Sequence, residues 1–254
     1  MTQLPQKNHL KVLTYNIHKG FNLSNRRFVL EQIRQGVHQV NADVVCLQEV
    51  CGFIAPVPGT ELHQKWETQF EYVADQTWPH YTYGKNAVYE GGDHGNAILS
   101  LFPIVKNQNL NISTNKYESR GLLHAVIEIP QGGERINLLT THMNLLESSR
   151  NIQLDLISNY IKKNIGPSDK TIFAGDFNDW RCILNQEFYT RLQFKEAFLE
   201  TSDRNPKTFP SIMPILPLDR VYYSGFKVEH TQVLNGYNWN KLSDHLPLLT
   251  EFSW

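Results

Sequence analysis

The chain has 254 residues and a formal net charge of −1, with 41% hydrophobic and 19% charged residues. This composition is typical of a globular protein, and the length suits a single sheet-rich domain over residues 1–254. Proteins that grip long nucleic acids usually carry a strong positive excess, so the near-neutral charge argues against duplex DNA as a substrate.

The cysteines and the apolar runs indicate where the chain is expected to work. Cys46, Cys51 and Cys182 are odd in number and lack zinc-site spacing, which favours reduced thiols. Residues 1–9 contain no apolar stretch of signal-peptide length, and no run of about 18 apolar residues predicts a transmembrane segment. We therefore expect a cytoplasmic protein without an obligate protein partner.

The first half of the chain alternates strands with helices. Residues 11–15 alternate as a strand does, and the apolar spacing over 26–39 predicts a helix with one buried face. Residues 43–48 are almost entirely apolar, which predicts a strand buried on both faces. A second helix is expected over 66–74 and a further strand over 96–102.

The second half repeats this order. Residues 122–129 and 135–141 flank a glycine-containing turn and predict a β-hairpin, which a helix over 151–164 follows. Further strands are expected over 171–174, 218–223, 227–234 and 246–252. Hairpins mixed with strand–helix–strand units predict a layered α/β domain.

Polar side chains follow most of these apolar strands. They are Asn16, His18, Glu49, Asn96, His142, Asn144, Asp176, Asn178, Asp219, Asp244 and His245. Carboxylates at buried strand ends lose hydration, and a bound divalent cation would compensate that loss. The hard-oxygen set of Glu49, Asp176 and Asp244, with Asn16 and Asn178, suits Mg²⁺, with Mn²⁺ and Ca²⁺ left open.

Seven sequence blocks occur in a fixed order: LTYNIHKG, VVCLQEV, GNAILS, THMNL, AGDFND, PLDRVYY and LSDHLP. Together they resemble the endonuclease/exonuclease/phosphatase superfamily, the deoxyribonuclease I-like proteins. The opening blocks resemble most closely its bacterial YbhP-like branch. The resemblance implies a four-layer α/β sandwich, in which two packed mixed β-sheets are flanked by helices and the active site lies at one end.

The resemblance also implies roles for single residues. Glu49 resembles the primary metal ligand, and Asn16 the asparagine that supports the metal or the phosphate. Asp176 and Asn178 resemble the pair that positions the attacking water and the phosphate. Asp244 resembles an auxiliary metal ligand.

Two histidines are implied to act in catalysis. His245 resembles the catalytic histidine, oriented by Asp219, and we expect it to titrate near its ordinary pKa. His142 resembles a second catalytic histidine, for which Asp93 is the only acidic partner that the sequence suggests. Arg120 lies where related branches place a phosphate-contacting arginine.

Three further residues are assigned to substrate binding. His18 stands where the exonuclease III branch usually has an aspartate, and a role confined to backbone contacts stays open for it. Asn96 and Asn144 lie in the GNAILS and THMNL blocks, with a turn role open for Asn96 and a scaffold role for Asn144. The apolar segment 208–219 fits contact with a lipid or a base, or simple loop packing.

These residues predict a Mg²⁺-dependent phosphodiesterase that directs water at a nucleic-acid or phospholipid-type diester. One alternative is a phosphomonoesterase acting on a sugar or inositol phosphate, which the lack of a lysine cluster beside the blocks disfavours. The other is a binding module without activity. Such a module would be expected to lose Glu49, Asp176 or His245, and all three are present.

Overall fold

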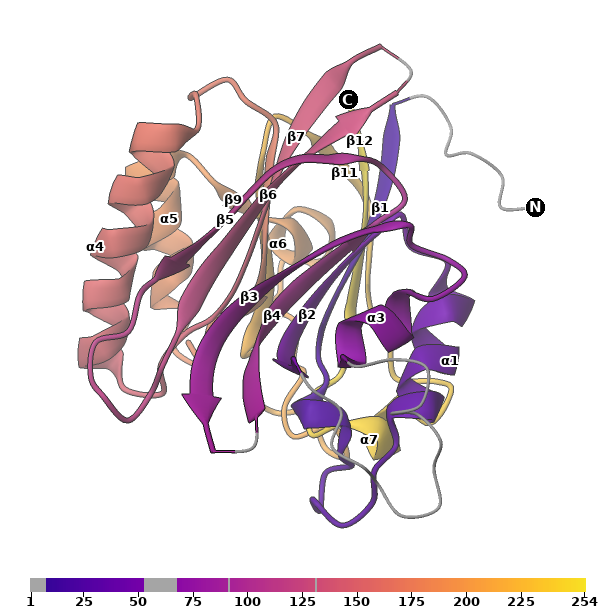
Figure 1. The fold of residues 1–254 in the computed structure, drawn as a ribbon. Coiled ribbons are helices and arrows are strands. Elements are labelled where there is room, and N and C mark those ends of the chain that lie inside the picture. Colours follow the sequence, from indigo (N-terminus) through magenta and orange to yellow (C-terminus); the bar gives the residue numbers. More distant parts are fainter. Residues whose placement is uncertain (1–7, 53–67, 91, 131) are drawn as a thin grey trace.

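The computed structural model describes residues 8–52, 68–90, 92–130 and 132–254, which form two mixed six-stranded sheets (Figure 1). The first sheet has the order β11 (Lys227–Val233), β12 (Leu248–Ser253), β1 (His9–Asn16), β2 (Val44–Cys51), β4 (Gly92–Ser100) and β3 (His80–Tyr89). The second has the order β5 (Ile104–Asn111), β6 (Gly121–Ile129), β7 (Glu134–His142), β8 (Thr171–Asp176), β10 (Asp219–Ser224) and β9 (Lys195–Glu196).

Each sheet is built around one parallel pair of strands. In the first sheet β1 and β2 run parallel and are joined through α1 (Leu30–Val40). In the second sheet β7 and β8 run parallel and are joined through α4 (Glu147–Asn164). The other paired strands run antiparallel, so the two sheets share one plan.

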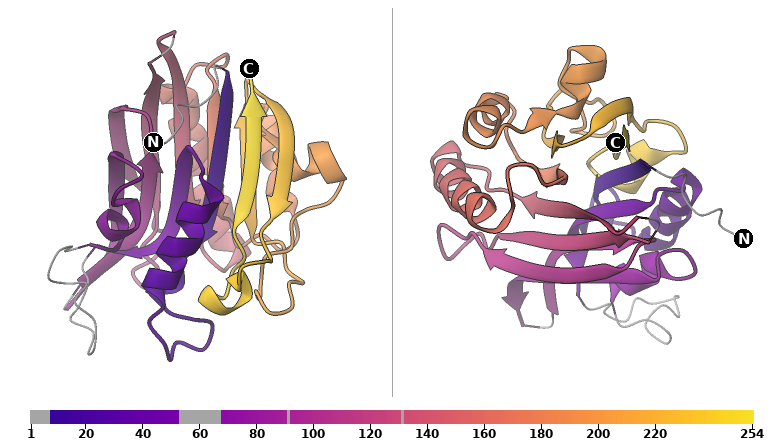
Figure 2. Two further views of the ribbon diagram at one scale, coloured as in Figure 1. Left: turned by 90° about the vertical axis from the view of Figure 1, so that its right-hand side faces the viewer. Right: turned by 90° about the horizontal axis from the view of Figure 1, so that it is seen from above.

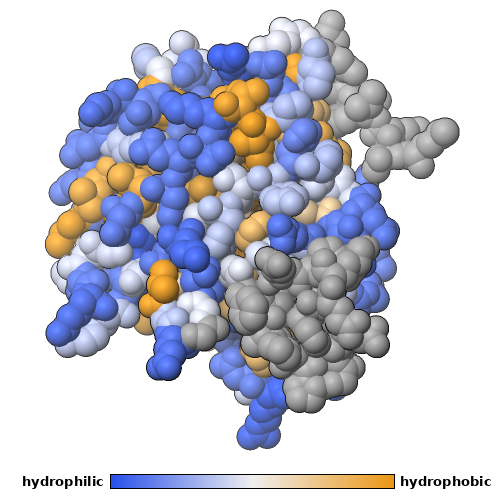
Figure 3. All heavy atoms as spheres, in the orientation of Figure 1, coloured by the Kyte–Doolittle hydropathy of each residue, from blue (hydrophilic) through white to orange (hydrophobic). Residues whose placement is uncertain are grey.

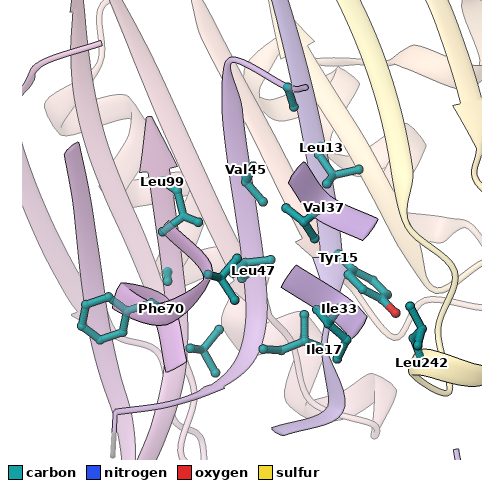
Figure 4. Packing of buried hydrophobic residues seen from close by; sticks show 14 of the residues in the cluster. Leu13, Tyr15, Ile17, Ile33, Val37, Val45, Leu47, Phe70, Leu99 and Leu242 are labelled. Carbon is teal, nitrogen blue, oxygen red and sulfur yellow. The ribbon is translucent and has the colours of Figure 1, made fainter. Parts of the chain in front are cut away.

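Three apolar clusters hold the layers together. Residues such as Val12, Ile98, Leu138 and Ile172 fill the space between the two sheets. The outer face of the first sheet is covered by α1 and α3 (Gln69–Ala74), as Figure 4 shows around Ile33. The outer face of the second sheet packs against α4 and α5 (Ile183–Leu192) (Figure 2). The expected four-layer sandwich is thus confirmed.

The three predicted helices all begin elsewhere than expected, and the one predicted over 151–164 starts earlier, at Glu147. The helix predicted over 26–39 starts at Leu30, because Phe28 forms a β-bridge with Phe21 instead of joining the helix. The helix predicted over 66–74 starts at Gln69, where the Thr68 side chain accepts a hydrogen bond from Glu71. Residues 66 and 67 lie outside the described residues.

The sequence pattern also missed several elements. Strands β3 and β5 lie at the edges of their sheets, where one side of the strand has no neighbour. Edge strands are often polar, and β5 reads IVKNQNLN with mostly exposed side chains. Helices α5, α6 (Ala197–Ser202) and α7 (Trp239–Leu242) were not predicted either, because they are short and only a few of their residues are buried.

Hydrophilic side chains cover most of the face in Figure 3, with separate apolar areas among them. Within the described ranges, no helix is both long and apolar enough to cross a bilayer. Strand β1 runs from the upper end of Figure 1 toward the lower end, where α7 lies. Asn16 is the last residue of β1 and therefore lies at the lower end, where we expect the other predicted site residues as well.

Candidate active site

The ends of the central strands bring the predicted residues together. Asn16 ends β1, His142 ends β7 and Asp176 ends β8, while Asp219 begins the antiparallel strand β10. In the strand register Asp176 is paired with both His142 and Asp219. The two sheets thereby place these groups at the same edge of the sandwich.

A pocket of about 340 Å³ opens at this edge. It is lined by Glu49, Arg120, His142, Leu145, Asp176, Asn178, Trp180, Phe209, Leu216, Leu218, Asp244 and His245. The polar residues come from both sheets, and much of the apolar lining comes from the segment 208–218. Such a volume suits a small ligand group.

Asp176 is the point where the polar side chains converge. Its Oδ2 accepts a hydrogen bond from Asn16 Nδ2 at 3.1 Å and lies 3.4 Å from His142 Nε2 and 3.6 Å from His245 Nε2. Its Oδ1 accepts the backbone N–H of Asn178 at 3.0 Å. Burial raises the pKa of the Asp176 carboxyl to about 6, although these neighbours favour the charged form.

Asp219 and His245 form a short hydrogen bond. His245 Nδ1 lies 2.7 Å from Asp219 Oδ2, which also accepts the Thr208 hydroxyl at 2.5 Å. An ionised carboxylate only accepts hydrogen bonds, so Nδ1 carries a proton and Nε2 faces Asp176.

The charge of His245 differs from the expected one. Burial disfavours the imidazolium form, but the carboxylates of Asp219 and Asp176 outweigh it and raise the pKa to about 10. The expectation that His245 titrates near its ordinary pKa is therefore wrong. Two buried carboxylates keep the imidazole protonated at neutral pH.

Glu49 and His142 form a further contact next to Asp176. Glu49 sits at a bulge of β2 with φ of 54°, and its Oε1 lies 3.7 Å from His142 Nδ1. Burial, helped by the nearby positive charge of Arg120, holds the pKa of His142 well below its usual range. These contacts therefore join carboxylates to a neutral imidazole.

Asp93 is not the acidic partner of His142. Its carboxylate accepts the Tyr83 hydroxyl at 2.8 Å and pairs with Lys85 at 2.7 Å. The carboxylates recorded beside His142 are those of Glu49 and Asp176. Sequence order could not reveal this, because Asp93 and His142 belong to different sheets.

Asp244 lines the pocket next to the first turn after β1. Its Oδ1 lies 3.7 Å from His18 Nδ1 and accepts the Ser243 hydroxyl at 3.2 Å. The backbone N–H of His18 donates to Asn16 Oδ1 at 3.1 Å. His18 thus stands beside two of the predicted metal ligands, although it is not among the lining residues.

Asn96 and Asn144 are not among the residues that line the pocket. The Asn96 amide donates to the Gly121 carbonyl at 3.1 Å and is buried. The Asn144 side chain is fully buried, accepts from Gln153 at 2.8 Å and donates to Glu118 at 2.9 Å. Both amides therefore brace the loops around the pocket, whereas Arg120 reaches the lining directly.

Several residues of the site hold a left-handed backbone conformation. Glu49, Asn178 and His18 have φ values of 54°, 51° and 47°, which non-glycine residues rarely adopt. Such conformations cost about 1–3 kcal/mol each and tend to cluster at functional sites. The protein therefore holds these three residues in place at a cost in folding free energy.

Some residues of the site were not predicted as functional. The Thr208 hydroxyl donates a second hydrogen bond to Asp219 Oδ2, and the Ser243 hydroxyl donates to the Asn16 backbone carbonyl at 2.7 Å. Trp180 and Phe209 line the pocket, with the Phe209 ring 5.1 Å from the His245 ring. Ser243 and Trp180 each lie within two residues of a motif residue, a signal that could have found them.

Asp176, Asp219 and His245 bring one possible metal-ligating atom each to within 4.8 Å of one another. Asp219 Oδ2 accepts two hydrogen bonds, whereas Asp219 Oδ1 is buried without a hydrogen-bond partner among the described residues. The Glu49 and Asp244 carboxylates are more exposed, at 20% and 22%, and each has a histidine nitrogen at 3.7 Å. Asp244 Oδ1 also accepts the Ser243 hydroxyl at 3.2 Å.

Comparison with known proteins shows which family the chain is related to. Residues 13–245 match the model of the Endonuclease/Exonuclease/phosphatase family. The YbhP protein of Escherichia coli (strain K12) is 39% identical over 254 residues, covering 99% of each chain.

Solved structures share the fold at lower identity. An endonuclease/exonuclease/phosphatase from Beutenbergia cavernae superposes with a TM-score of 0.78 at 20% identity, covering 97% of this chain and 72% of that one. A mannosyl-6-phosphatase from Bacteroides thetaiotaomicron gives 0.71 at 20% identity, covering 96% and 100%. A truncated TDP2 from Caenorhabditis elegans gives 0.67 at 20% identity, covering 97% and 98%. The chain therefore belongs to the Endonuclease/Exonuclease/phosphatase family.

Proposed function

We propose that the chain is a divalent-metal-dependent phosphodiesterase, folded as one catalytic domain. The observation that carries the proposal is the buried Asp219–His245–Asp176 network, whose members His245 and Asp176 line one pocket with the carboxylate of Glu49. This arrangement combines groups that move or hold a proton with groups that attract a cation. Family membership supports hydrolysis of a phosphoric ester.

The donor set fits a hard cation such as Mg²⁺ or Mn²⁺. Glu49 and Asp244 line the pocket with carboxylates that are 20% and 22% exposed and that have a histidine nitrogen at 3.7 Å each. Glu49, Asp244 and the amide oxygen of Asn16 would hold the ion. Bound there, it would neutralise charge that builds on the phosphoryl oxygens.

The chain's own residues supply the proton chemistry. Asp176, whose pKa burial raises to about 6, accepts a proton from the attacking water more readily than an exposed carboxylate would. His245, which Asp219 keeps protonated, donates a hydrogen bond through Nε2 to a phosphoryl oxygen. Asn178 and the neutral His142 line the same pocket and orient the phosphate.

The test is hydrolysis of bis-p-nitrophenyl phosphate with Mg²⁺ or Mn²⁺, and after removal of metal by EDTA. We expect turnover that needs the cation and that is lost in His245→Ala, which also controls for contaminating enzymes. A folded protein inert toward this diester, nucleic acids and phospholipids alike would overturn the proposal.

Phosphomonoester hydrolysis is the second candidate, because Arg120 lines the pocket and, in the part of the chain that the structure describes, its Nε has no hydrogen-bond partner, while its Nη2 pairs with Glu118 at 3.4 Å. A phosphate monoester carries more negative charge than a diester, and a free guanidinium N–H suits it. The ratio of kcat/KM for p-nitrophenyl phosphate and its bis ester separates the two. A higher value for the monoester would favour the phosphatase.

A further inference from the structure

One wall of the pocket carries an aromatic ring that the proposed chemistry does not use. Trp180 lines the pocket, yet 45% of its surface is exposed. It follows Asn178 by two residues on the loop after β8, and Asp179 between them accepts the Leu184 backbone N–H at 2.8 Å. This hydrogen bond anchors the loop to the start of α5 and holds the Trp180 indole beside the site.

One face of the Trp180 ring is already covered. The Arg150 guanidinium lies 5.0 Å from the ring centroid, and the Arg150 side chain is almost fully buried. Its Nη1 donates to the backbone carbonyls of Asn144 at 3.2 Å and Leu145 at 2.6 Å. Arg150 thus links the Trp180 ring to the chain that carries Leu145, another lining residue.

A ring held on one face by a cation leaves its exposed surface for a ligand. Flat aromatic groups gain from stacking on such a surface beyond the simple burial of apolar area. Because the ring is held before the ligand arrives, little side-chain freedom is lost on binding. The pocket volume of about 340 Å³ has room for a phosphoryl group and one ring system.

We propose that Trp180, backed by Arg150, is a stacking platform that makes the pocket selective for phosphoesters carrying a planar aromatic group next to the phosphorus. The inference rests on the proposed phosphoesterase site and narrows its substrate class. A phenolic ring esterified to the phosphate has the required shape. An acyl chain would gain from apolar burial alone.

The test compares two non-hydrolysable ligands of similar size, benzylphosphonate and cyclohexylmethylphosphonate, by calorimetric titration in the presence of Mg²⁺. We expect the wild-type protein to bind the benzyl compound about two- to tenfold more tightly. In Trp180→Leu the two affinities should become equal, while Trp180→Phe should keep most of the difference. Leu145→Ala is the matched control, which should weaken both ligands alike and leave their ratio unchanged.

Three results would overturn the platform: equal affinities in the wild-type protein, an unchanged ratio in Trp180→Leu, or no binding of either phosphonate. The wild-type comparison needs no variant, so a folding defect in Trp180→Leu leaves it decisive. Binding also requires no turnover. A protein that hydrolyses diesters without preferring the benzyl ligand contradicts only the platform, and one that prefers it without turnover contradicts only the proposed function.

Discussion

The site holds two pairs of carboxylates in opposite ways. Asp176 and Asp219 have side chains only 1% exposed and accept close hydrogen bonds, including that of 2.7 Å from His245. Glu49 and Asp244 are 20% and 22% exposed, and each has a histidine nitrogen at 3.7 Å. We infer that the fold fixes the proton-handling groups and leaves the cation-binding groups free to adjust.

Removing the partner of the buried carboxylates should have the largest effect on activity. In His245→Ala the Asp219 carboxylate loses its partner and the pocket loses its imidazolium, so kcat/KM should fall by about 10²–10⁴-fold. Steady-state hydrolysis of bis-p-nitrophenyl phosphate measures this. His230→Ala, at an exposed position on β11, is the control that should keep full activity. A His245→Ala protein with more than about a tenth of the activity would contradict the assignment.

Changing one of the two more exposed carboxylates should alter the metal requirement more than the stability of the fold. Glu49→Gln should raise the metal concentration for half-maximal rate by about 10- to 100-fold or more. Substituting a residue that only supports a metal ligand already weakens metal binding by that factor. Its unfolding free energy should stay within about 0.5 kcal/mol of the wild type, because the side chain is partly exposed. Titration of activity with Mg²⁺ and urea denaturation measure both.

The matched control for this prediction is Glu90→Gln, at an exposed position beyond β3. It should leave the metal titration unchanged. An equal metal requirement in Glu49→Gln and in the wild type would remove Glu49 from the cation site.

A third substitution tests the contact between the two sheets behind the pocket. The Gln48 amide donates to Thr14 at 3.1 Å in its own sheet and to Thr140 at 2.9 Å in the other. Gln48→Leu leaves both hydroxyls buried without this partner and should cost about 1–3 kcal/mol of unfolding free energy.

The triple variant Thr14→Val, Gln48→Leu, Thr140→Val removes the polar groups together and should recover much of that loss. Urea denaturation of all three proteins gives the comparison. If Gln48→Leu were as stable as the wild type, the two sheets would not depend on this contact.

The smallest effect concerns a buried carboxylate remote from the pocket lining. Asp43 precedes β2 and accepts the Lys11 backbone N–H at 2.7 Å, and burial raises its pKa to about 6. Since the folded state binds this proton more tightly than the unfolded state, stability should fall as pH rises from about 4 to 6. Asp43→Asn should remove this pH dependence from urea denaturation series at several pH values. A pH dependence equal to that of the wild type would show that Asp43 ionises freely.

The sequence predicted the parts of the molecule that depend on local pattern. The apolar run over 43–48 and the polar residues after it indicated both β2 and Glu49. The resemblance between sequence blocks anticipated the contact of Asp219 with His245, which the structure has at 2.7 Å. The strand follows from the apolar pattern alone, whereas the contact of Asp219 with His245 was implied by the resemblance.

Other features depend on contacts between distant segments. The pKa of His245 is set by Asp219 and Asp176, which belong to the opposite sheet from the strand that follows it. The left-handed backbone at Glu49 arises at a bulge against β4, which alternation of apolar residues cannot indicate. Asn144 looked like a pocket residue from its motif, but Gln153 and Glu118 hold it in the scaffold.

The pairing of β1 with β12 has a consequence for how the chain folds during synthesis. The ribosome makes β1 first, yet β1 lies between β2 and the last strand of the described chain. The Ser243 hydroxyl must also reach the carbonyl of Asn16 across 227 positions of sequence. The end of β1 therefore cannot reach its final contacts until the segment through β12 has been translated.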